Sequence, residues 1–295
     1  MKLGTLGVWV GMDAMSAEAA AEFARRVEGW GYSALWIPES RGRNALVHSG
    51  WLLAQTKSLV VATGIANIYA RDPMAMANGQ KALAELSRGR FLLGLGVSHR
   101  PTVEGLRGHA YGKPLATMRA YLEAMKKAPY GAPSAPETPP VVLAAIGPKM
   151  LALSAELADG AHPYNTIPEH TQKARAILGP RKLLCPEVWV LLDTDAAKAR
   201  RAGREALARY LALENYVNGW RFQGFSDSDL AGGGSDRFID QMVAWGDEKA
   251  IRARIEAHLS AGADQVTIQP IHPEGSRQPV DERILSLLAP SGGRP

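Results

Sequence analysis

One stretch of the chain, residues 59–99, constrains its fold more than any other. It reads as a short apolar strand, an irregular loop, a helix, a glycine-containing turn and a second apolar strand. Asp72 is a good N-cap for the helix, and Pro73 suits the first helical position. A helix that crosses over between two buried strands makes those strands parallel. The stretch therefore predicts a parallel sheet in which each strand ends in a loop rich in small residues.

The same alternation of strand and helix runs along almost the whole chain. We predict strands at residues 3–10, 34–37, 59–63, 91–95, 141–145, 160–163, 183–192 and 265–269. We predict helices at residues 16–30, 44–56, 72–86, 114–127, 148–157, 168–178, 195–215, 235–245 and 247–261. The buried stripe of the third helix is predicted to be Ala75, Gly79, Ala82, Leu83 and Leu86. About eight parallel strands, each followed by a helix, indicate a closed sheet, a (β/α)8 TIM barrel with insertions.

Three segments interrupt this alternation. Residues 101–113 form a polar insertion, and residues 216–234 are predicted to be irregular and aromatic. The proline-rich segment 130–140 is either a domain linker or a surface loop within one domain. We favour the loop because the strand and helix pattern resumes at residue 141, and we expect a single domain over residues 1–295.

Composition narrows the class of protein. Hydrophobic residues make up 46% of the 295 residues, which is typical of a globular chain. The single cysteine, Cys185, excludes an internal disulfide, and a reducing cytoplasmic setting is expected. We expect no signal peptide and no membrane span, because the chain has no sufficiently long apolar run. The net charge of +5 indicates either an ordinary basic surface or an anionic ligand, and the absence of a basic block interleaved with aromatic residues argues against nucleic acid.

Active sites of barrels form where the strands end at their carboxyl side. No lysine lies inside a predicted strand, which argues against a Schiff-base aldolase, and no His-x-His pair supplies metal-ligand spacing. Gly94 and Gly96 begin like a dinucleotide loop, but the third glycine is missing. The candidate side chains at the strand ends are Trp9, Glu39, Ser40, residues 64–67, Ser98, His99, residues 146–149, Tyr164, Asn165, Asp193 and residues 269–272.

Two of these segments each allow two interpretations. Gly64 directly follows a β-branched strand, so residues 63–67 form either a backbone bulge with a purpose or a simple turn that ends the strand. Gly147, Pro148 and Lys149 start a helix just after a strand. Free backbone N–H groups beside a cation suit a phosphate, whereas the plain alternative is an ordinary helix start with an exposed lysine.

The same segments carry a resemblance to a known family. ALWIPE, TGIAN, RDPMAMANGQKALAELSRGRFLLGLGVSH, AAIGPKMLALSAELADGAHPY and HLSAGADQVTIQ occur in order and together resemble the luciferase-like monooxygenase superfamily. TGIAN with RDPMAMAN, and the later GFSDSDLAGGGSDRFIDQMVAWGD, resemble the branch that uses the deazaflavin coenzyme F420. The FMN-dependent monooxygenase branch is the rival. The resemblance implies a bacterial-luciferase-like TIM barrel with a coenzyme ring lying in its mouth.

The resemblance also implies roles for individual residues. Gly64 and Ile65 occupy the position of a non-prolyl cis peptide that backs the coenzyme ring in many relatives. Glu39 occupies the acidic position after the second strand, and His99 occupies the polar position after the fourth. Both are expected to be catalytic, with His99 in the acid/base role. Relatives that oxidise sugar phosphates carry a histidine where this chain has Ser40, so glucose 6-phosphate is a poor substrate candidate. The full coenzyme-binding set expected is Trp9, Glu39, Ser40, Gly64, Ile65, Ala66, Asn67, Ser98, His99, Ile146, Gly147, Pro148 and Lys149.

Three functions are therefore distinguished. The leading hypothesis is an F420-dependent oxidoreductase that transfers hydride to or from a small organic molecule. The alternatives are an FMN-dependent two-component monooxygenase and a barrel that binds a coenzyme without turnover. Tyr216, Trp220, Phe222 and Phe225 either form an apolar wall for the substrate or pack an insertion onto the barrel. A homodimer is expected by resemblance alone, and His162 is expected to be structural.

Overall fold

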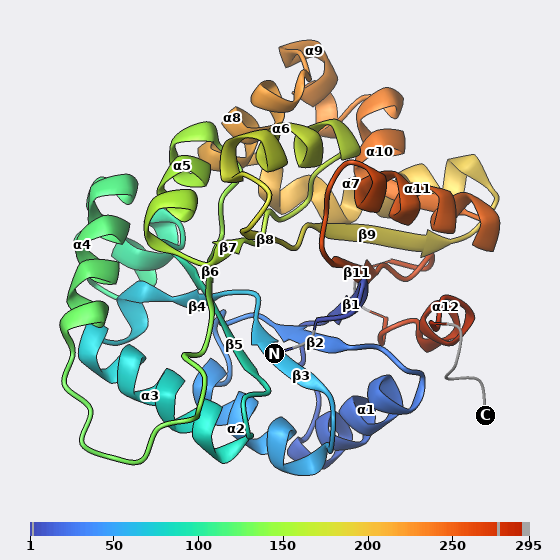
Figure 1. Ribbon diagram of the computed structural model, residues 1–295. Helices are drawn as coiled ribbons and strands as arrows, with labels where there is room; N and C mark the ends of the chain where they lie inside the picture. Colours follow the sequence, from blue (N-terminus) through green and yellow to red (C-terminus); the bar gives the residue numbers. More distant parts are fainter. Residues whose placement is uncertain (2, 276–277, 291–295) are drawn as a thin grey trace.

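The computed structural model describes residues 1, 3–275 and 278–290, and it shows an α/β fold built on a parallel sheet (Figure 1). Residues 2, 276–277 and 291–295 of the predicted domain lie outside the described part. The strands are β1 (Leu6–Trp9), β2 (Ala34–Ile37), β3 (Val60–Thr63), β4 (Ala66–Asn67), β5 (Phe91–Gly96), β6 (Val141–Leu143), β7 (Gly160–Ala161), β8 (Leu183–Leu184), β9 (Glu187–Leu192), β10 (Val243–Gly246) and β11 (Val266–Pro270).

Helices surround this sheet (Figure 1). They are α1 (Ala17–Gly29), α2 (Ala45–Gln55), α3 (Pro73–Leu86), α4 (Pro114–Lys127), α5 (Pro148–Leu157), α6 (Pro168–Leu178), α7 (Ala196–Leu211), α8 (Glu214–Gln223), α9 (Asp227–Leu230), α10 (Asp236–Met242), α11 (Glu248–Ser260) and α12 (Glu282–Leu287). Short turns η1 (Ile68–Ala70), η2 (Pro101–Leu106) and η3 (Ala231–Gly233) complete the elements. Side chains of Ser16, Asn44 and Asp72 accept hydrogen bonds from the first turns of α1, α2 and α3, so these helices begin where their caps predict.

The strand order is β10-β9-β11-β1-β2-β3-β5-β6-β7-β8, with β4 paired to β5, and each pairing is parallel. The segment that contains β8 and β9 is hydrogen-bonded on both sides. On one side the amide of Cys185 donates to the carbonyl of Ala161 at 2.9 Å. On the other side the amide of Thr267 donates to the carbonyl of Pro186 at 2.9 Å. Strands far apart in sequence thereby meet in one sheet.

Several predicted elements match the structure residue for residue, namely the strand 34–37 and the helices 114–127, 148–157 and 168–178. The predicted strand 183–192 is wrong in one respect, because it is broken between β8 and β9. Pro186 lies in this break and has no N–H to donate to a neighbouring strand. The strands predicted at 3–10, 141–145 and 160–163 are shorter in the structure than the apolar runs suggest.

The region after β9 needs more correction. The predicted helix 195–215 ends at Leu211, and most of the segment 216–234, predicted to be irregular, is helical in α8 and α9. Residues 243–245, predicted to end a helix, instead belong to β10, whose residues pair with β9 from Trp189 to Leu192. This pairing is a tertiary contact that the local apolar pattern does not contain.

The buried face of α3 also differs from the prediction. Leu83 is buried as expected, but Ala75 and Leu86 are exposed, Leu86 to 75%, while Gly79 and Ala82 are half-buried. The helix is packed against α2, α4 and β5, so its buried face is set by three neighbours at once. The remaining buried residues of α3 are Met76, Ala77, Gln80 and Ala84.

Polar side chains lie inside the sheet as well as apolar ones. The indole of Trp36 donates to Gln265 Oε1 at 2.8 Å, and the ring of His162 stacks on Trp36 with 4.3 Å between centroids. The backbone carbonyl of Cys185 lies 2.7 Å from His162 Nδ1, which makes this nitrogen the protonated one. His162 is thus a packing residue of the sheet interior. Within the described residues, no helix is both long and apolar enough to span a bilayer.

Acid should destabilise this fold through its buried histidines, of which His162, His170 and His258 are the most deeply buried of those described. Burial lowers the pKa of His162 and of His170 to about 4, and burial together with Arg254 lowers that of His258 to about 3. The ordinary value is about 6.5, so the unfolded chain takes up protons in this range that the folded chain does not. The free energy of unfolding therefore falls as pH drops below about 6.5, by up to roughly 1.4 kcal/mol per pH unit for each histidine.

We expect the melting temperature to fall steadily from pH 7 to pH 5. His258→Gln should lower stability at pH 7 but flatten this pH dependence, since glutamine does not titrate. His109→Gln is the matched control, because His109 is exposed. Equal pH slopes for both variants in thermal melts would contradict the assignment.

Candidate functional site

The connection between β3 and β4 contains a cis peptide bond between Gly64 and Ile65, as the resemblance implies. Three neighbours hold this connection. The indole of Trp9 donates to the carbonyl of Gly64 at 2.8 Å, and the amide of Gly64 donates to the carbonyl of Ile37 at 2.8 Å. The amide of Glu39 donates to the carbonyl of Ile65 at 3.1 Å. The backbone here is therefore a bulge anchored to β1 and β2, and the simple turn is excluded.

Two glycines of β5 make room for the bulge. A Cβ on Gly94 would overlap the carbonyl oxygen of Thr63 and lie 3.3 Å from the side chain of Ile65. A Cβ on Gly96 would overlap the same isoleucine. The Thr63 hydroxyl also donates to the carbonyl of Gly94 at 2.7 Å and accepts from its amide at 2.8 Å. The Gly-Leu-Gly pattern therefore serves close packing of β3 on β5, and not a dinucleotide phosphate.

The carboxylate of Glu39 is buried, with a side chain 5% exposed, and both of its oxygens are engaged. Oε1 accepts from the amide of Ala45 at 3.2 Å and from the guanidinium of Arg71. Oε2 accepts from the amide of Asn67 at 2.9 Å. Glu39 thus ties the start of α2 and the end of the bulge to β2, while its neighbour Ser40 is exposed. This geometry suits a positioning role better than proton transfer.

We expect Glu39→Gln to destabilise the protein by roughly 3 kcal/mol, because Arg71 is left buried without a counter-charge. The matched control is Glu282→Gln, which breaks the pair of Glu282 with Arg26, whose side chains are 37% and 44% exposed. That change should cost less than about 1 kcal/mol. Chemical denaturation measures both, and equal losses would show that the Glu39 pair is no more important than a surface pair.

His99 follows β5 and is held by α8. Its Nδ1 lies 3.1 Å from Asn215 Oδ1, and its ring lies 5.6 Å from that of Tyr216. Because the amide oxygen accepts, Nδ1 carries the proton and Nε2 keeps a lone pair. Burial lowers the pKa of His99, and the nearby positive charge of Arg209 lowers it further against the opposing effect of Asn215. The histidine is therefore neutral at pH 7, and the preceding Ser98 has the left-handed backbone that few residues besides glycine adopt, with φ at 57°.

The start of α5 has the geometry of an anion site. Gly147 is its N-cap and brings no capping side chain, and a Cβ there would meet nothing within 4 Å. Pro148 and Lys149 are exposed, and within the described residues Lys149 has no ion-pair partner. His170 donates through Nε2 to the carbonyl of Ile146 at 2.7 Å, and this bond holds the turn that leads into α5. The first-turn N–H groups and a free cation are thus presented together.

Helix α8 joins the loops that follow three strands. Asn215 contacts His99 after β5, and Gln223 Oε1 accepts from the amide of Ile167 at 3.0 Å beyond β7. Gly219 faces Ile146 after β6, where a Cβ would lie 2.6 Å from that side chain. Tyr216 and Trp220 are buried in this arrangement. Of the predicted aromatic wall, Tyr216, Trp220 and Phe222 therefore lie in a helix and not in an irregular loop, and Phe225 follows that helix.

Sequence reasoning missed several residues that the structure brings to these strand ends. Glu187 lies inside the sheet, 0% exposed, where its Oε2 accepts from the amide of Asn165 at 2.9 Å. Burial raises its pKa well above the ordinary range, which favours the protonated, neutral form. An acidic residue within the apolar run EVWVLL was the available signal. No signal in the sequence pointed to Arg209 and Tyr210, because there they belong to an ordinary polar helix.

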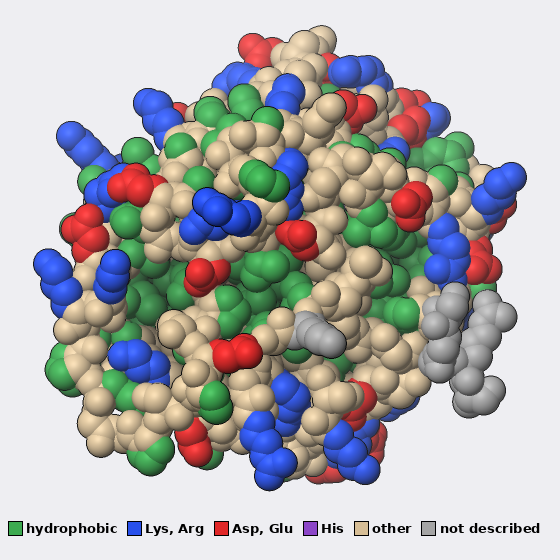
Figure 2. Space-filling model, viewed as in Figure 1, with side chains coloured by type: hydrophobic (Ala, Val, Ile, Leu, Met, Phe, Trp, Pro, Cys, Tyr) green, Lys and Arg blue, Asp and Glu red, His purple; other side chains and the backbone are tan. Residues whose placement is uncertain are grey.

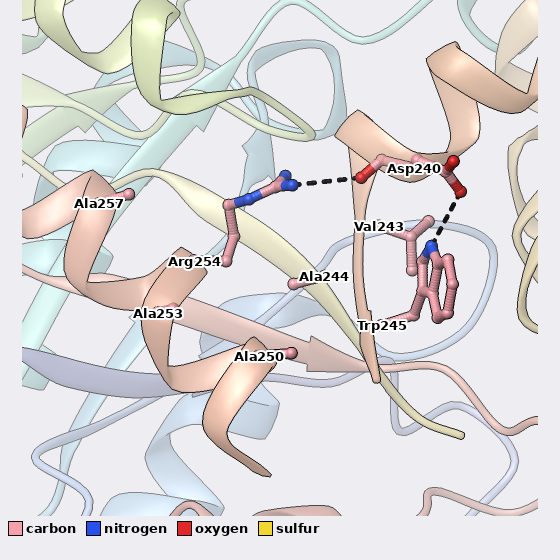
Figure 3. Close-up of a pocket in the computed structure, with 8 residues that line it drawn as sticks. All are labelled: Asp240, Val243, Ala244, Trp245, Ala250, Ala253, Arg254 and Ala257. Carbon is pink, nitrogen blue, oxygen red and sulfur yellow. Dashed lines mark hydrogen bonds between the residues drawn. The ribbon is translucent and has the colours of Figure 1, made fainter. Parts of the chain in front are cut away.

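A surface cavity of about 450 Å³ lies elsewhere, between β10 and α11, and contains none of the predicted residues (Figure 3). Arg254 points from α11 across this cavity and donates to the carbonyl of Asp240 at 3.2 Å (Figure 3). It also donates to the carbonyl of Gln241 at 2.5 Å. These are carbonyls of the last turn of α10, so the arginine caps that helix and its N–H groups are engaged by backbone carbonyls.

The charges on the face shown in Figure 2 are of both signs and interspersed, which fits an ordinary basic surface over that face. Among the described residues there is no group of three or more His, Cys, Asp and Glu side chains placed to hold a metal ion.

A family model described as luciferase-like monooxygenase matches residues 2–265. The chain belongs to this family. A putative coenzyme F420-dependent oxidoreductase of Mycobacterium tuberculosis is 29% identical over 254 residues, which is 72% of each chain. A 5,10-methylenetetrahydromethanopterin reductase of Methanolobus tindarius is 25% identical over 296 residues, covering 86% of this chain and 90% of its own.

Solved structures agree on the fold. An F420-dependent secondary alcohol dehydrogenase in complex with an F420-acetone adduct superposes with a TM-score of 0.76 at 14% identity, over 98% of this chain and 97% of its own. The oxygenating constituent of 3,6-diketocamphane monooxygenase of Pseudomonas putida, in complex with FMN, gives a TM-score of 0.67 at 16% identity, over 99% and 98%. The luciferase-like fold is thus shared by F420-dependent and FMN-dependent relatives.

Proposed function

We propose that this protein is an F420-dependent oxidoreductase that transfers hydride to or from a small organic substrate. The likeness to the F420-dependent relative of Mycobacterium tuberculosis carries the choice of coenzyme. The anchored bulge at Gly64 and Ile65 carries its location, because the resemblance places the coenzyme ring there. The proposal includes a closed eight-stranded barrel that forms one domain. The hydrogen bonds on both sides of the segment 183–187 support this closure.

The residues present fit such a coenzyme. The start of α5 offers N–H groups and charge to a phosphate, because its N-cap is open and Lys149 has no ion-pair partner in the described part of the chain. Trp9 holds the carbonyl of Gly64, so that the face formed by Gly64, Ile65, Ala66 and Asn67 is rigid. Glu39 braces this face, and Ser40, Ser98, Ile146, Gly147 and Pro148 complete the proposed binding set with His99.

The bound deazaflavin would supply the hydride chemistry. His99 would then handle the substrate proton, since its Nε2 is an acceptor at neutral pH. Asn215 keeps the opposite nitrogen protonated. The buried rings of Tyr216 and Trp220 keep water from this side of the strand ends.

The assignment is tested by mixing the purified protein with F420 or with FMN and following coenzyme fluorescence. Tight binding of F420 and weak binding of FMN supports the proposal. The reverse order supports an FMN-dependent two-component monooxygenase, which the FMN-bound structural relative favours. Hydride exchange between reduced F420 and a panel of carbonyls and enones excludes a barrel without turnover.

We also propose a homodimer. Exposed apolar side chains gather on α2 and α3, where Val47 is 73%, Trp51 38% and Met74 48% exposed. Such side chains on neighbouring helices suit a second copy of the chain. Sedimentation velocity measures this directly. A cytoplasmic location rests on the single cysteine alone.

Lys149→Glu should weaken F420 binding by well over tenfold. A like charge about 4 Å from a phosphate costs on the order of 4 kcal/mol at an effective dielectric of about 20, before salt screening. Lys126→Glu is the matched control, since it lies near the carboxyl end of α4 and thus at the opposite end of the strands. An unchanged dissociation constant for the Lys149 variant at low salt would move the phosphate elsewhere.

Gly64→Ala should weaken coenzyme binding and lower stability by about 1–3 kcal/mol. The added Cβ would lie 2.6 Å from the indole nitrogen of Trp9 and 3.1 Å from His162 Nε2, so the contacts that hold the bulge must shift. Gly29→Ala is the control, because a Cβ there meets nothing within 4 Å. Wild-type binding and melting temperature for Gly64→Ala would remove the bulge from the site.

A further inference from the structure

Arg209 lies in the last turn of α7, beside the strand ends, and its guanidinium is held on a platform of tyrosine. The guanidinium carbon is 4.5 Å from the centroid of the Tyr210 ring. The guanidinium also donates a hydrogen bond to the hydroxyl of Tyr210. The residue is exposed as a whole, so solvent reaches the charge while the ring fixes its place.

A chain of hydrogen bonds fixes the platform itself. The hydroxyl of Tyr164 donates to Gln269 Oε1 at 2.9 Å. Since each hydroxyl has one proton, the 2.8 Å contact between the two tyrosines is a bond donated by Tyr210 to Tyr164. The Tyr210 oxygen is then free to accept from Arg209. Every hydroxyl proton of the chain points inward, and the guanidinium is its outer end.

The hydrogen-bond partners of Arg209 differ from those of other arginines near the strand ends. Arg71 is paired with Glu39, and Arg43 donates to the carbonyls of Met12 and Met15. Within the described ranges, the one group that Arg209 hydrogen-bonds is the neutral Tyr210, and no carboxylate lies within ion-pair distance of it. The guanidinium has four further N–H groups with no partner there, directed by a rigid support.

The neighbours of Arg209 are those of the proposed reaction site. The ring centroid of Tyr210 lies 4.8 Å from that of Tyr216, and the ring centroid of Tyr216 lies 5.6 Å from that of His99. Tyr164 lies 5.3 Å from Trp9, whose indole holds Gly64. The cation thus stands at one end of a continuous aromatic layer that reaches both the bulge and the histidine.

We propose that Arg209 is a carboxylate-binding site for the substrate, and that the substrate is an organic acid with an apolar or aromatic body. The fork of a guanidinium matches a carboxylate, and the neighbouring ring of Tyr216 suits the apolar part. Assigning this site to the substrate rests on the proposed function, whereas the anion site itself does not depend on a coenzyme.

The test uses two probes of the same shape, phenylacetate and the neutral phenylacetamide, titrated calorimetrically into the coenzyme-free protein. The wild type should bind phenylacetate more tightly. Arg209→Gln should lose that preference, with affinity for phenylacetate reduced roughly tenfold or more. Arg201→Gln is the matched control on the same helix, exposed and without an ion-pair partner among the described residues, and it should keep the preference.

Two further variants separate charge from geometry. Arg209→Lys keeps the charge and loses the fork, so it should bind phenylacetate with intermediate affinity. Tyr210→Phe keeps the arginine and removes its hydrogen bond, and it should also be intermediate. Melting curves show that each variant is folded, and a variant that is not folded leaves the other two to decide.

Three results would overturn the proposal. The first is equal or undetectable binding of both probes to the wild type. The second is a preference for phenylacetate that survives in Arg209→Gln. The third is a loss of F420 affinity in Arg209→Gln, which would show that the arginine binds the acidic groups of the coenzyme and not a substrate carboxylate. Failure of F420 to bind any variant, with the probe preference intact, would overturn the proposed function and leave the carboxylate site standing.

Discussion

The candidate site depends on the hydrogen bond between the indole of Trp9 and the carbonyl of Gly64. This bond crosses from β1 to the end of β3 and holds a backbone that turns away from its own strand. The bulge fits against β5 because Gly94 and Gly96 have no side chains and leave room for the Thr63 carbonyl and the Ile65 side chain. The rest of the strand-end surface is arranged around this feature.

Burial favours the neutral forms of the ionisable groups in the sheet interior. His162 and Glu187 are almost fully buried, and burial lowers the pKa of the histidine and raises that of the carboxyl, in each case toward the uncharged form. The two charged groups that are buried at the strand ends, Glu39 and Arg71, are paired with each other. A site built in this way offers oriented dipoles and hydrogen bonds, which suits a coenzyme that itself carries the reactive atoms.

Helices α7 and α8 supply the other half of the candidate site. They bring Tyr210, Asn215 and Tyr216 to the loops that follow β5 and β7, although up to 116 residues of chain separate the contacting residues. One wall is therefore made from the sheet and its bulge, and the other from inserted helices. In a family that shares its fold between F420-dependent and FMN-dependent enzymes, such an inserted wall is where substrate choice can change without altering the sheet.

Local pattern was enough for much of the fold. Caps such as Ser16, Asn44 and Asp72 marked helix starts, and apolar runs marked strands such as 34–37, because both signals act within one turn or one strand. The resemblance also gave the correct place for the cis peptide at Gly64 and Ile65. The strand β10 and the helix α8 were missed, because pairing with β9 and packing across three loops override weak local preferences.

What the sequence by itself determined was the parallel α/β class, the family, and which residues stand at the strand ends. These follow from periodicity and motifs that need no knowledge of distant contacts. The tertiary structure decided what those residues do. It engaged both oxygens of Glu39, set the protonated nitrogen of His99 through Asn215, and placed the guanidinium of Arg209 against Tyr210. The physical reason is that charge state and hydrogen-bond direction depend on burial and partners, and these come from parts of the chain that only folding brings together.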